Sequence, residues 1–347
     1  MFKEIRKNTI RKTMNIKSIY TKRTYEKKTF WDLVYEWEDI LAKELNANII
    51  NEPKAFDKSL KGIPGLYKWM TKGDLSLCFQ MGAEIVPDRI KPLQELLGLR
   101  AKNISDVIPC IIDFWQPEND IRAMERAYSN NKVVLVTSME AIEFLDKHNV
   151  DINYKHWPLS LPNQYSLDNA PSCGYEKKYD LALMGRQCLL MSNFLEEYID
   201  KHPNFTYVTS KRENGHFNYY TNKGEFVGCA DDRKGYFDIM RSAKIGFYST
   251  PGVDNKSGSN GYNQVTPRFL ELLSAQCHII AHYPVNADTD FYNLSDFSED
   301  INTYEKFEKA MKIALEEPVD MKKYREYLSH HYTTVRANQL ELIVDNL

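Results

Sequence analysis

The chain of 347 residues is long for one ordinary domain, and its length predicts two domains of about 100–200 residues each. Its 43% hydrophobic and 27% charged residues are typical of a globular protein and exclude a disordered one. No apolar run reaches the roughly 20 residues of a membrane-spanning helix. The net charge of −3 provides no general field for nucleic acid, so we expect no nucleic-acid partner.

The six cysteines are scattered, several within apolar runs, and form no CxxC pair. This pattern predicts reduced thiols packed as small apolar side chains, without disulfide or zinc site, and hence a cytoplasmic protein. Residues 1–28 are basic but contain no apolar stretch, unlike a signal peptide. Two interpretations of the basic residues 3–28 stay open: peripheral contact with an anionic membrane, or a solvated segment.

The first half of the chain alternates between strand-like and helix-like segments. From Phe30 to Leu45 apolar residues recur at helical spacing and predict an amphipathic helix. Further predicted helices cover Ile90–Leu97, Asp120–Ser129 and Met139–His148. Short runs rich in β-branched or aromatic residues predict strands at Leu75–Phe79, Val107–Phe114, Lys132–Thr137 and Tyr154–Leu159. Such alternation indicates βαβ units and a parallel sheet.

A segment rich in Pro, Ser, Asn and Gly, residues 158–178, interrupts the pattern and predicts an interdomain linker. The alternation then restarts. Strands are predicted at Asp180–Met184, Phe205–Thr209, Lys244–Tyr248 and Cys277–Ala281, and helices at Cys188–Lys201, Tyr236–Ser242, Pro267–Ala275 and from Tyr304 onward. We therefore expect Rossmann-like domains at 1–165 and 166–325, with a last helix, 326–347, returning to the first.

The segment Gly258–Ala281 carries the clearest chemistry, since a polar loop with glycines leads into a helix and then a strand. Thr266 is placed to cap this helix, and Pro267 suits its first turn. A helix start of this kind binds phosphate, and Arg268 would add a charged donor. Glu271, one turn further, suits vicinal ribose hydroxyls. An ordinary capped helix with surface ion pairs explains the same residues equally well.

Four segments resemble group 1 glycosyltransferases, especially their spore-maturation-like branch. TPRFLELLSAQCHIIAHYP is similar to the donor-site helix and strand, and YDLALMGRQ to the first strand of the nucleotide domain with its Gly-Arg turn. YFDIMRSAKIGFYSTPG and YLSHHYTTVRANQLELI are similar to a later helix–strand element and to the closing helix. Order and spacing are more specific than any single motif. The resemblance implies an α/β chain of GT-B type, with two Rossmann-like domains facing a cleft.

The resemblance also implies roles for individual residues. Glu271 would bind the donor ribose, and the Gly185-Arg186 turn would meet the diphosphate, with Lys211 or Arg212 as further basic candidates. Two positions depart from the family. Its paired-glutamate motif would have a glutamate at position 263, where this chain has Asn263, and the usual glycine before the last strand is Gln276. Asn263 puts the sugar contact in question.

The acceptor side is less clear in the sequence. Asp113 and His156 both follow predicted strands of the first half, and ligands bind open α/β sheets at such strand ends. Either side chain could position or deprotonate an acceptor hydroxyl. A loop-capping aspartate and a hydrogen-bonded structural histidine are the open alternatives.

Neither pattern suggestive of a metal is convincing. Asp288-Thr289-Asp290 has the D-x-D form that binds metal–diphosphate in other glycosyltransferases, but three-residue acidic patterns are common. His330 and His331 are adjacent and do not share a helix face. We expect no metal and no other cofactor, with the diphosphate charge met by protein groups.

The function predicted from these features is transfer of a sugar from a nucleotide-diphosphate donor to a hydroxyl acceptor such as a glycan. The resemblance implies a retaining outcome, in polysaccharide or surface-glycan synthesis. Two alternatives stay open. One is a sugar-nucleotide epimerase or a phosphorylase on the same scaffold, because fold alone does not fix activity. The other is a GT-B protein that binds nucleotide or glycan without catalysis, which Asn263 favours.

Overall fold

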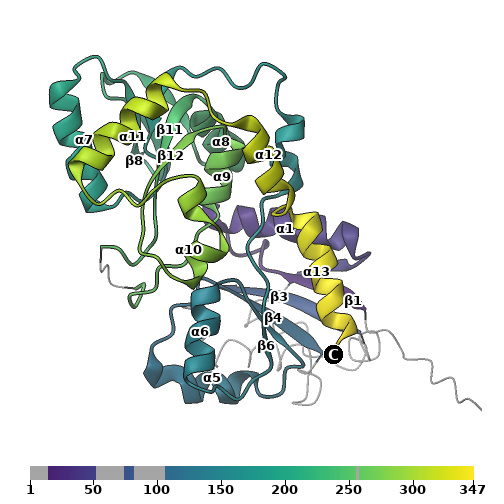
Figure 1. Cartoon of the computed structure of the whole chain (residues 1–347). Helices are drawn as coiled ribbons and strands as arrows, with labels where there is room; N and C mark the ends of the chain where they lie inside the picture. The colour runs from purple at the N-terminus through teal and green to yellow at the C-terminus, as the bar shows by residue number, and fades with distance from the viewer. Residues whose placement is uncertain (1–14, 52–73, 82–105, 255–257) are drawn as a thin grey trace, which may run out of the picture.

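The computed structural model describes residues 15–51, 74–81, 106–254 and 258–347, and its helices and strands carry the labels of Figure 1. Two sheets organise these residues, one in each half of the chain. The helix predicted at 90–97 and residues 3–14 of the basic segment 3–28 lie outside the described residues. Within them, no helix combines the length and apolarity needed to cross a membrane.

The first sheet has six strands in the order β2-β1-β3-β4-β5-β6, and every neighbouring pair is parallel. The predicted parallel sheet is thereby confirmed. Its strands are β1 (Ile16–Thr21), β2 (Asn48–Asn51), β3 (Leu75–Met81), β4 (Val107–Ile112), β5 (Val134–Val136) and β6 (Tyr154–His156). β4 is buried on both faces, as expected for a central parallel strand.

Among the described residues, three α-helices accompany this sheet: α1 (Thr29–Glu44), α5 (Ile121–Tyr128) and α6 (Met139–Lys147). α1 buries an apolar stripe that includes Trp31, Val34, Trp37 and Leu41. Those residues recur every three or four positions, which is why the helix was predictable. Ser138 caps α6 through a hydrogen bond from the backbone N–H of Ala141.

The second sheet also has six strands, in the order β10-β9-β8-β7-β11-β12. Its parallel part comprises β7 (Tyr179–Ala182), β8 (Tyr207–Glu213), β11 (Ala243–Ser249) and β12 (His278–His282). β9 (His216–Thr221) and β10 (Phe226–Cys229) add an antiparallel edge. Asn214 and Gly215 both have positive φ and turn the chain back after β8 into this antiparallel edge.

The helices of this half are α7 (Leu189–Lys201), α8 (Arg233–Arg241), α9 (Arg268–Ser274), α10 (Ala287–Phe291), α11 (Tyr304–Glu316) and α12 (Met321–Ser329). α7 and α11 pack their apolar faces together over Leu181, Ile245 and Ile280 on one side of the sheet. α9 is buried from Phe269 to Ser274, and only its first residue, Arg268, is partly exposed.

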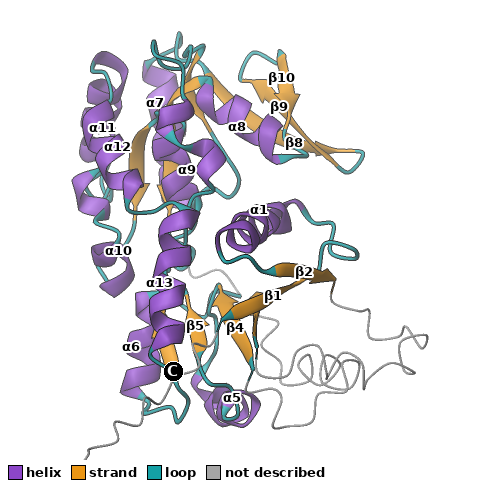
Figure 2. Ribbon diagram, turned by 90° about the vertical axis from the view of Figure 1, so that its right-hand side faces the viewer, coloured by secondary structure: helices purple, strands orange, loops and turns teal. Residues whose placement is uncertain are grey.

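The chain crosses between the halves twice, and the two crossings lie side by side. After β6 it runs upward through residues 157–167 (Figure 1), and after α12 it returns through α13 (Thr333–Asp345) (Figure 2). Leu161 forms a parallel bridge with Tyr332, and Trp157 Nε1 donates to the carbonyl of Arg336 at 2.9 Å. α13 packs against α1 of the first half. The domain boundaries themselves stay predictions.

Candidate functional site

A cavity of about 550 Å³ lies where the two halves face each other. Its first-half wall is mostly apolar and its second-half wall is mostly polar. The first half contributes Thr29, Phe30, Leu33, Val34 and Trp37 from α1, and Met81, Ile112, Asp113 and Trp115 at the ends of β3 and β4. The second half contributes Ala230, Asp232, Arg233, Tyr236, Thr266, Pro267, Arg268 and Glu271 around the starts of α8 and α9. Carboxyl ends of parallel strands are the usual place for a ligand in such sheets.

Arg233 connects the two walls. Its guanidinium Nη2 donates to Glu271 Oε1 at 2.7 Å, and its Nε lies 3.4 Å from Glu36 Oε2 on α1. Glu36 in turn accepts a hydrogen bond from the hydroxyl of Tyr165. Although burial opposes the charge, the carboxylates of Glu271 and Glu36 raise the pKa of Arg233. The charged guanidinium thus fixes the carboxylate of Glu271 at the edge of the cavity.

Arg268 and Arg186 meet at the centre of the second sheet. Arg268 Nη1 donates to the backbone carbonyl of Arg186 at 2.9 Å. Arg186 itself donates to the carbonyls of Thr250 and Pro251 at 3.0 and 2.9 Å. These contacts span the ends of β7 and β11, where the strand order reverses, and nucleotides bind doubly wound sheets at such a point.

The close approach of these two arginines depends on Gly185. Its φ is +62°, and a Cβ atom there would lie 2.3 Å from Arg268 Nη2. Burial and the neighbouring Arg268 lower the pKa of Arg186, so positive charge is concentrated here. Arg268 Nε is buried and has no hydrogen-bond partner among the described residues. An anion at this point would neutralise the positive charge and accept a hydrogen bond from Arg268 Nε.

Asp113 faces the cavity from the first half. It follows β4 with a φ of +52°, a conformation that Asp and Asn adopt more readily than most residues. Burial raises the pKa of its carboxyl to about 6. A carboxyl with a pKa near neutrality is suited to exchange a proton with a hydroxyl.

No protein-family model and no curated protein sequence matches the chain. Among solved structures it is similar to sucrose-phosphate synthase from Thermosynechococcus elongatus, with a TM-score of 0.50 and 9% identity over 96% of this chain and 98% of that one. It is also similar to TarM, with a TM-score of 0.51 and 10% identity over 82% of this chain. The match covers 58% of TarM, so this chain spans little more than half of that protein. The fold is GT-B-like.

A putative UDP-N-acetylglucosamine 2-epimerase from Listeria monocytogenes gives a lower TM-score of 0.46, at 11% identity over 94% of this chain and 95% of that one. Identities this low concern the fold alone.

The GT-B cleft contains four of the predicted site residues: Asp113, Thr266, Arg268 and Glu271. Gly185 and Arg186 lie just behind Arg268 and contact it without lining the cavity. The structure thus brings together six residues that the sequence places far apart. Their roles toward a donor stay predictions.

The expected cap on the donor-site helix is wrong. α9 begins after Pro267, and no side chain caps it. Pro267 already has helical φ and ψ (−53°, −26°), so the backbone carbonyl of Thr266 accepts from the N–H of Phe269, while the N–H of Thr266 donates to the Tyr248 hydroxyl. Two amides expected to meet a phosphate are therefore occupied. The side chain of Arg268 offers a further donor there.

Lys211 and Arg212 do not reach the cleft. Both are exposed on β8, where it pairs with β9 in the antiparallel edge. Their charged groups lie over the rings of Tyr220 and Phe217, at 5.4 and 5.6 Å from the ring centres. The sequence suggested a basic turn after a strand, whereas the strand continues through these residues.

His156 is also remote from the cavity. It ends β6, and its ring packs edge-to-face against Phe291 of α10 with centres 4.6 Å apart. Burial lowers its pKa to about 4, which keeps the ring neutral. This environment fits the structural alternative and leaves Asp113 as the acceptor-side candidate.

The two departures from the family pattern have different settings. Asn263 Oδ1 accepts from the hydroxyl of Thr250 at 2.7 Å, and its backbone N–H donates to Glu140, so Asn263 lies against the loop after β11 rather than in the cavity. Gln276 has a φ of +58°, the conformation for which the family's glycine is suited.

The D-x-D pattern serves the packing between the halves. The carboxylate of Asp288 is fully buried and accepts hydrogen bonds from the backbone N–H groups of Met139 and Val265. Asp290 is exposed. The two carboxylates therefore lie in different environments. His331, of the adjacent pair His330–His331, is likewise engaged, with its Nδ1 2.9 Å from Arg336 Nη2.

The sequence analysis missed Arg233, whose Nη2 lies 2.7 Å from Glu271 Oε1. A local signal existed, since Asp232 caps α8 and places Arg233 at the first helical position. Nothing in that signal identifies its partners on α1 and α9. Tyr236 and Trp115 were missed for the same reason, because they join the cavity only through tertiary packing.

Proposed function

We propose that the chain is a glycosyltransferase that moves a sugar from a nucleotide-diphosphate donor to a hydroxyl acceptor. The observation that supports this most directly is the arrangement of the cavity. Arg268 and Glu271 lie beside the point where the strand order of the second sheet reverses, and Asp113 faces them from the first half. In this proposal Arg268 binds the diphosphate, Glu271 the ribose and Asp113 the acceptor hydroxyl.

Two variants separate the donor contacts. Arg268→Ala should lower the affinity for a nucleoside diphosphate by about 10–100-fold, which corresponds to a charged hydrogen bond of about 1.5–3 kcal/mol. The affinity for the bare nucleoside should be nearly unchanged. Glu271→Gln should lower the affinity for both ligands by the same factor, because both contain the ribose. Isothermal titration calorimetry measures each affinity.

Lys211→Ala is the matched control, since it removes an equally plausible basic residue that the fold places outside the cavity. Equal losses for nucleoside and nucleoside diphosphate in Arg268→Ala, or a loss in Lys211→Ala as large as in Arg268→Ala, would contradict the assignment.

Activity is tested by incubating the full chain with nucleotide sugars, with and without hydroxyl acceptors. Transfer should require an acceptor, whereas an epimerase forms product without one. Sugar nucleotides can first be screened by thermal shift, because a ligand at 100 times its Kd adds about 2.7 kcal/mol to stability.

A second candidate is a GT-B protein that binds a nucleoside diphosphate without catalysis. Two features favour it: the carboxylate of Glu271 is already paired with Arg233, and Asn263 occupies the position of a family glutamate. Binding of the diphosphate with neither transfer nor donor hydrolysis would support this candidate.

We also propose that transfer needs no metal, since Arg268 and Arg186 concentrate positive charge at the expected diphosphate position. Activity should persist in excess EDTA and in Asp290→Asn. Asp288 is unsuitable for this test because its substitution would disturb the packing between the halves. Loss of turnover on chelation, restored by Mg²⁺ or Mn²⁺, would overturn the proposal.

A further inference from the structure

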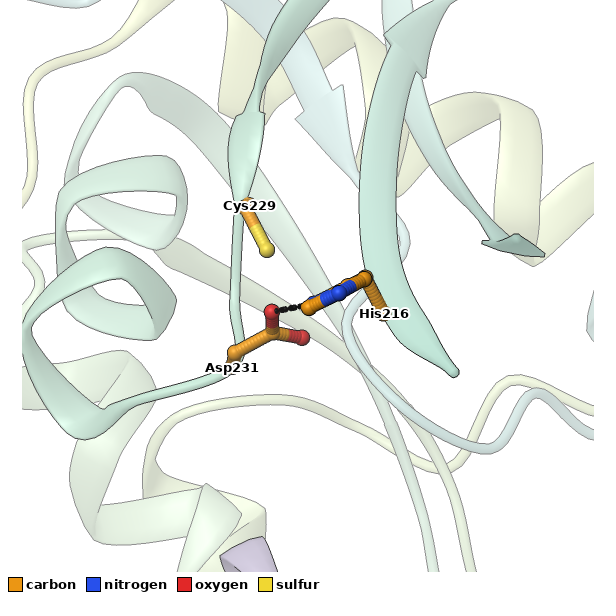
Figure 3. A group of neighbouring side chains, drawn as sticks. All are labelled: His216, Cys229 and Asp231. Carbon is orange, nitrogen blue, oxygen red and sulfur yellow. Dashed lines mark hydrogen bonds and ion pairs between the residues drawn. The ribbon is translucent and has the colours of Figure 1, made fainter. Parts of the chain in front are cut away.

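Three side chains meet beside the cleft, outside the cavity, at the junction of the antiparallel edge with α8. His216 is the first residue of β9, Cys229 is the last residue of β10, and Asp231 lies in the short link to α8. Their ligand-type atoms all lie within 4.8 Å of one another. Figure 3 shows the thiol, imidazole and carboxylate directed toward a common space.

Hydrogen bonds hold the carboxylate at the centre of this group. Asp231 Oδ1 accepts from the backbone N–H of Phe217 at 2.9 Å, and Oδ2 faces His216 Nδ1. The side chains of His216 and Asp231 are 62% and 38% exposed. One side of the group is therefore open to solvent, while the carboxylate is positioned from the backbone side.

This combination of donors is specific in its chemistry. Mg²⁺ and Ca²⁺ prefer oxygen ligands, whereas a thiolate together with an imidazole is typical of zinc sites. Zinc binds nitrogen and oxygen at about 2.0–2.2 Å and sulfur at about 2.3 Å, so tetrahedral ligand atoms lie roughly 3.3–3.8 Å apart. The separations of at most 4.8 Å here are compatible with that geometry after small side-chain rotations.

We propose that His216, Cys229 and Asp231 form a zinc-type metal site with three protein ligands and a fourth position open to water. On binding, Zn²⁺ would displace the thiol proton of Cys229 to solvent, and the ring proton of neutral His216 would lie on Nε2, so that Nδ1 is free to bind the ion. The sequence had predicted no zinc site, because the three ligands follow none of the usual Cys/His spacings and converge only through the β9–β10 pairing.

The position of the site gives it a structural role. None of the three ligands lines the cavity, but the segment they fix carries Ala230, Asp232 and Arg233, which do. A bound ion would join the start of β9 to the start of α8. Zinc should therefore raise the thermal stability of the chain, and the proposal does not depend on the transferase activity.

The test uses full-length protein stripped with EDTA, kept reduced without thiols, and titrated with Co²⁺ as a spectroscopic substitute for Zn²⁺. The wild-type chain should bind one ion, with the visible bands of tetrahedral Co²⁺ and a thiolate-to-metal charge-transfer band in the near ultraviolet. Equilibrium dialysis should likewise find one Zn²⁺ per chain.

Cys229→Ser and His216→Ala should each lower the affinity for Zn²⁺. The expected loss exceeds the roughly 10–100-fold that follows removal of a residue that only hydrogen-bonds to a ligand. Cys173→Ser is the matched control, because Cys173 is also a free thiol and is exposed. Cys173→Ser should bind Zn²⁺ with the affinity of the wild type.

A wild-type Co²⁺ complex without a thiolate charge-transfer band would overturn the proposal, and this result needs no variant to fold. Unchanged Zn²⁺ affinity in both Cys229→Ser and His216→Ala would overturn it as well. In that case the group is an ordinary His–Asp pair beside a thiol.

Discussion

Asp113 shows how one residue of the cleft couples stability to pH. Its folded-state pKa of about 6 lies above the ordinary value of 3.8 because burial disfavours the carboxylate. The folded chain therefore holds this proton more tightly than the unfolded chain. Below about pH 4 the side chain is protonated in both states, and above about pH 6 it is ionised in both. Stability from this group is present at low pH and is lost as the pH rises from about 4 to about 6.

Asp113→Asn should remove that loss, because an amide carries no charge and Asn tolerates a positive φ. Relative to the wild type, the variant should gain about 1–3 kcal/mol in free energy of unfolding between pH 4 and pH 7. Urea denaturation at several pH values measures the difference. Other carboxyls with a raised pKa, such as those of Glu140 and Asp288, titrate in both proteins, so their contributions cancel in the difference. A stability difference independent of pH would contradict this account.

At the same scale, the sequence predicts residues well where their role follows from a local motif. Arg268 and Glu271 belong to a loop–helix pattern, and both line the cleft. Arg233 could not be predicted in this way, because its partners Glu36 and Glu271 come from other helices. Lys211 was misplaced because a basic stretch looks the same in a turn and in an exposed strand.

Among the elements, α8 is the helix whose position matters most to the cleft, since Arg233 and Tyr236 both project from it. Its start is held by Asp232, whose side chain accepts from the backbone N–H of Gly235 at 2.7 Å. An N-cap of this kind typically contributes about 0.5–2 kcal/mol.

Asp232→Ala should lower the free energy of unfolding by about 0.5–2 kcal/mol. It should also lower the affinity for a nucleoside diphosphate, because Arg233, and with it Glu271, is held less firmly. Asp232→Asn should restore both, because Asn caps as well as Asp without the charge. Asp320→Ala is the control: it removes the matching cap of α12, from Lys323 N at 3.0 Å, far from the cavity. It should cost similar stability and leave ligand affinity unchanged. Failure of Asp232→Asn to restore affinity would mean that the charge, and not the cap, is what matters.

Elements with a clear period were predictable from the sequence, and those defined by pairing were not. The apolar stripe of α1 and the continuous apolar run of β4 both specify their structures locally. β9 is defined by its antiparallel pairing with β8 and β10 and not by a local period. The zinc-type group depends on the pairing of β9 with β10.

On the scale of the whole molecule, the two crossings determine how the walls of the cleft face each other. Arg336 lies on the second crossing, where it contacts the first, and is 2% exposed. Its guanidinium donates to the carbonyls of Pro158, Leu159 and His330 at 3.0–3.2 Å. The two-half organisation followed from chain length and the 158–178 segment, but the crossing geometry did not, because it depends on residues separated by most of the second half.

Arg336→Ala should therefore weaken the connection between the halves as well as overall stability. The expected loss is at least about 2 kcal/mol, since a large buried side chain is removed and several carbonyls lose their donor. Arg336→Lys should not restore it, because an ammonium cannot reproduce the planar fork of donors. Arg325→Ala is the control, since Arg325 is 52% exposed and pairs with Asp168 at the surface, where such pairs contribute about 0–1 kcal/mol.

The sequence itself provides the means of observing the two halves separately. All five tryptophans precede residue 158, so their fluorescence follows the first half, whereas far-ultraviolet circular dichroism follows both. In urea, the two signals should coincide for the wild type and for Arg325→Ala, because the crossings make unfolding cooperative. They should separate for Arg336→Ala, with the fluorescence transition at lower urea, since α13 then holds α1 less firmly. Coincident curves for Arg336→Ala at a lowered midpoint would show that Arg336 stabilises both halves without connecting them.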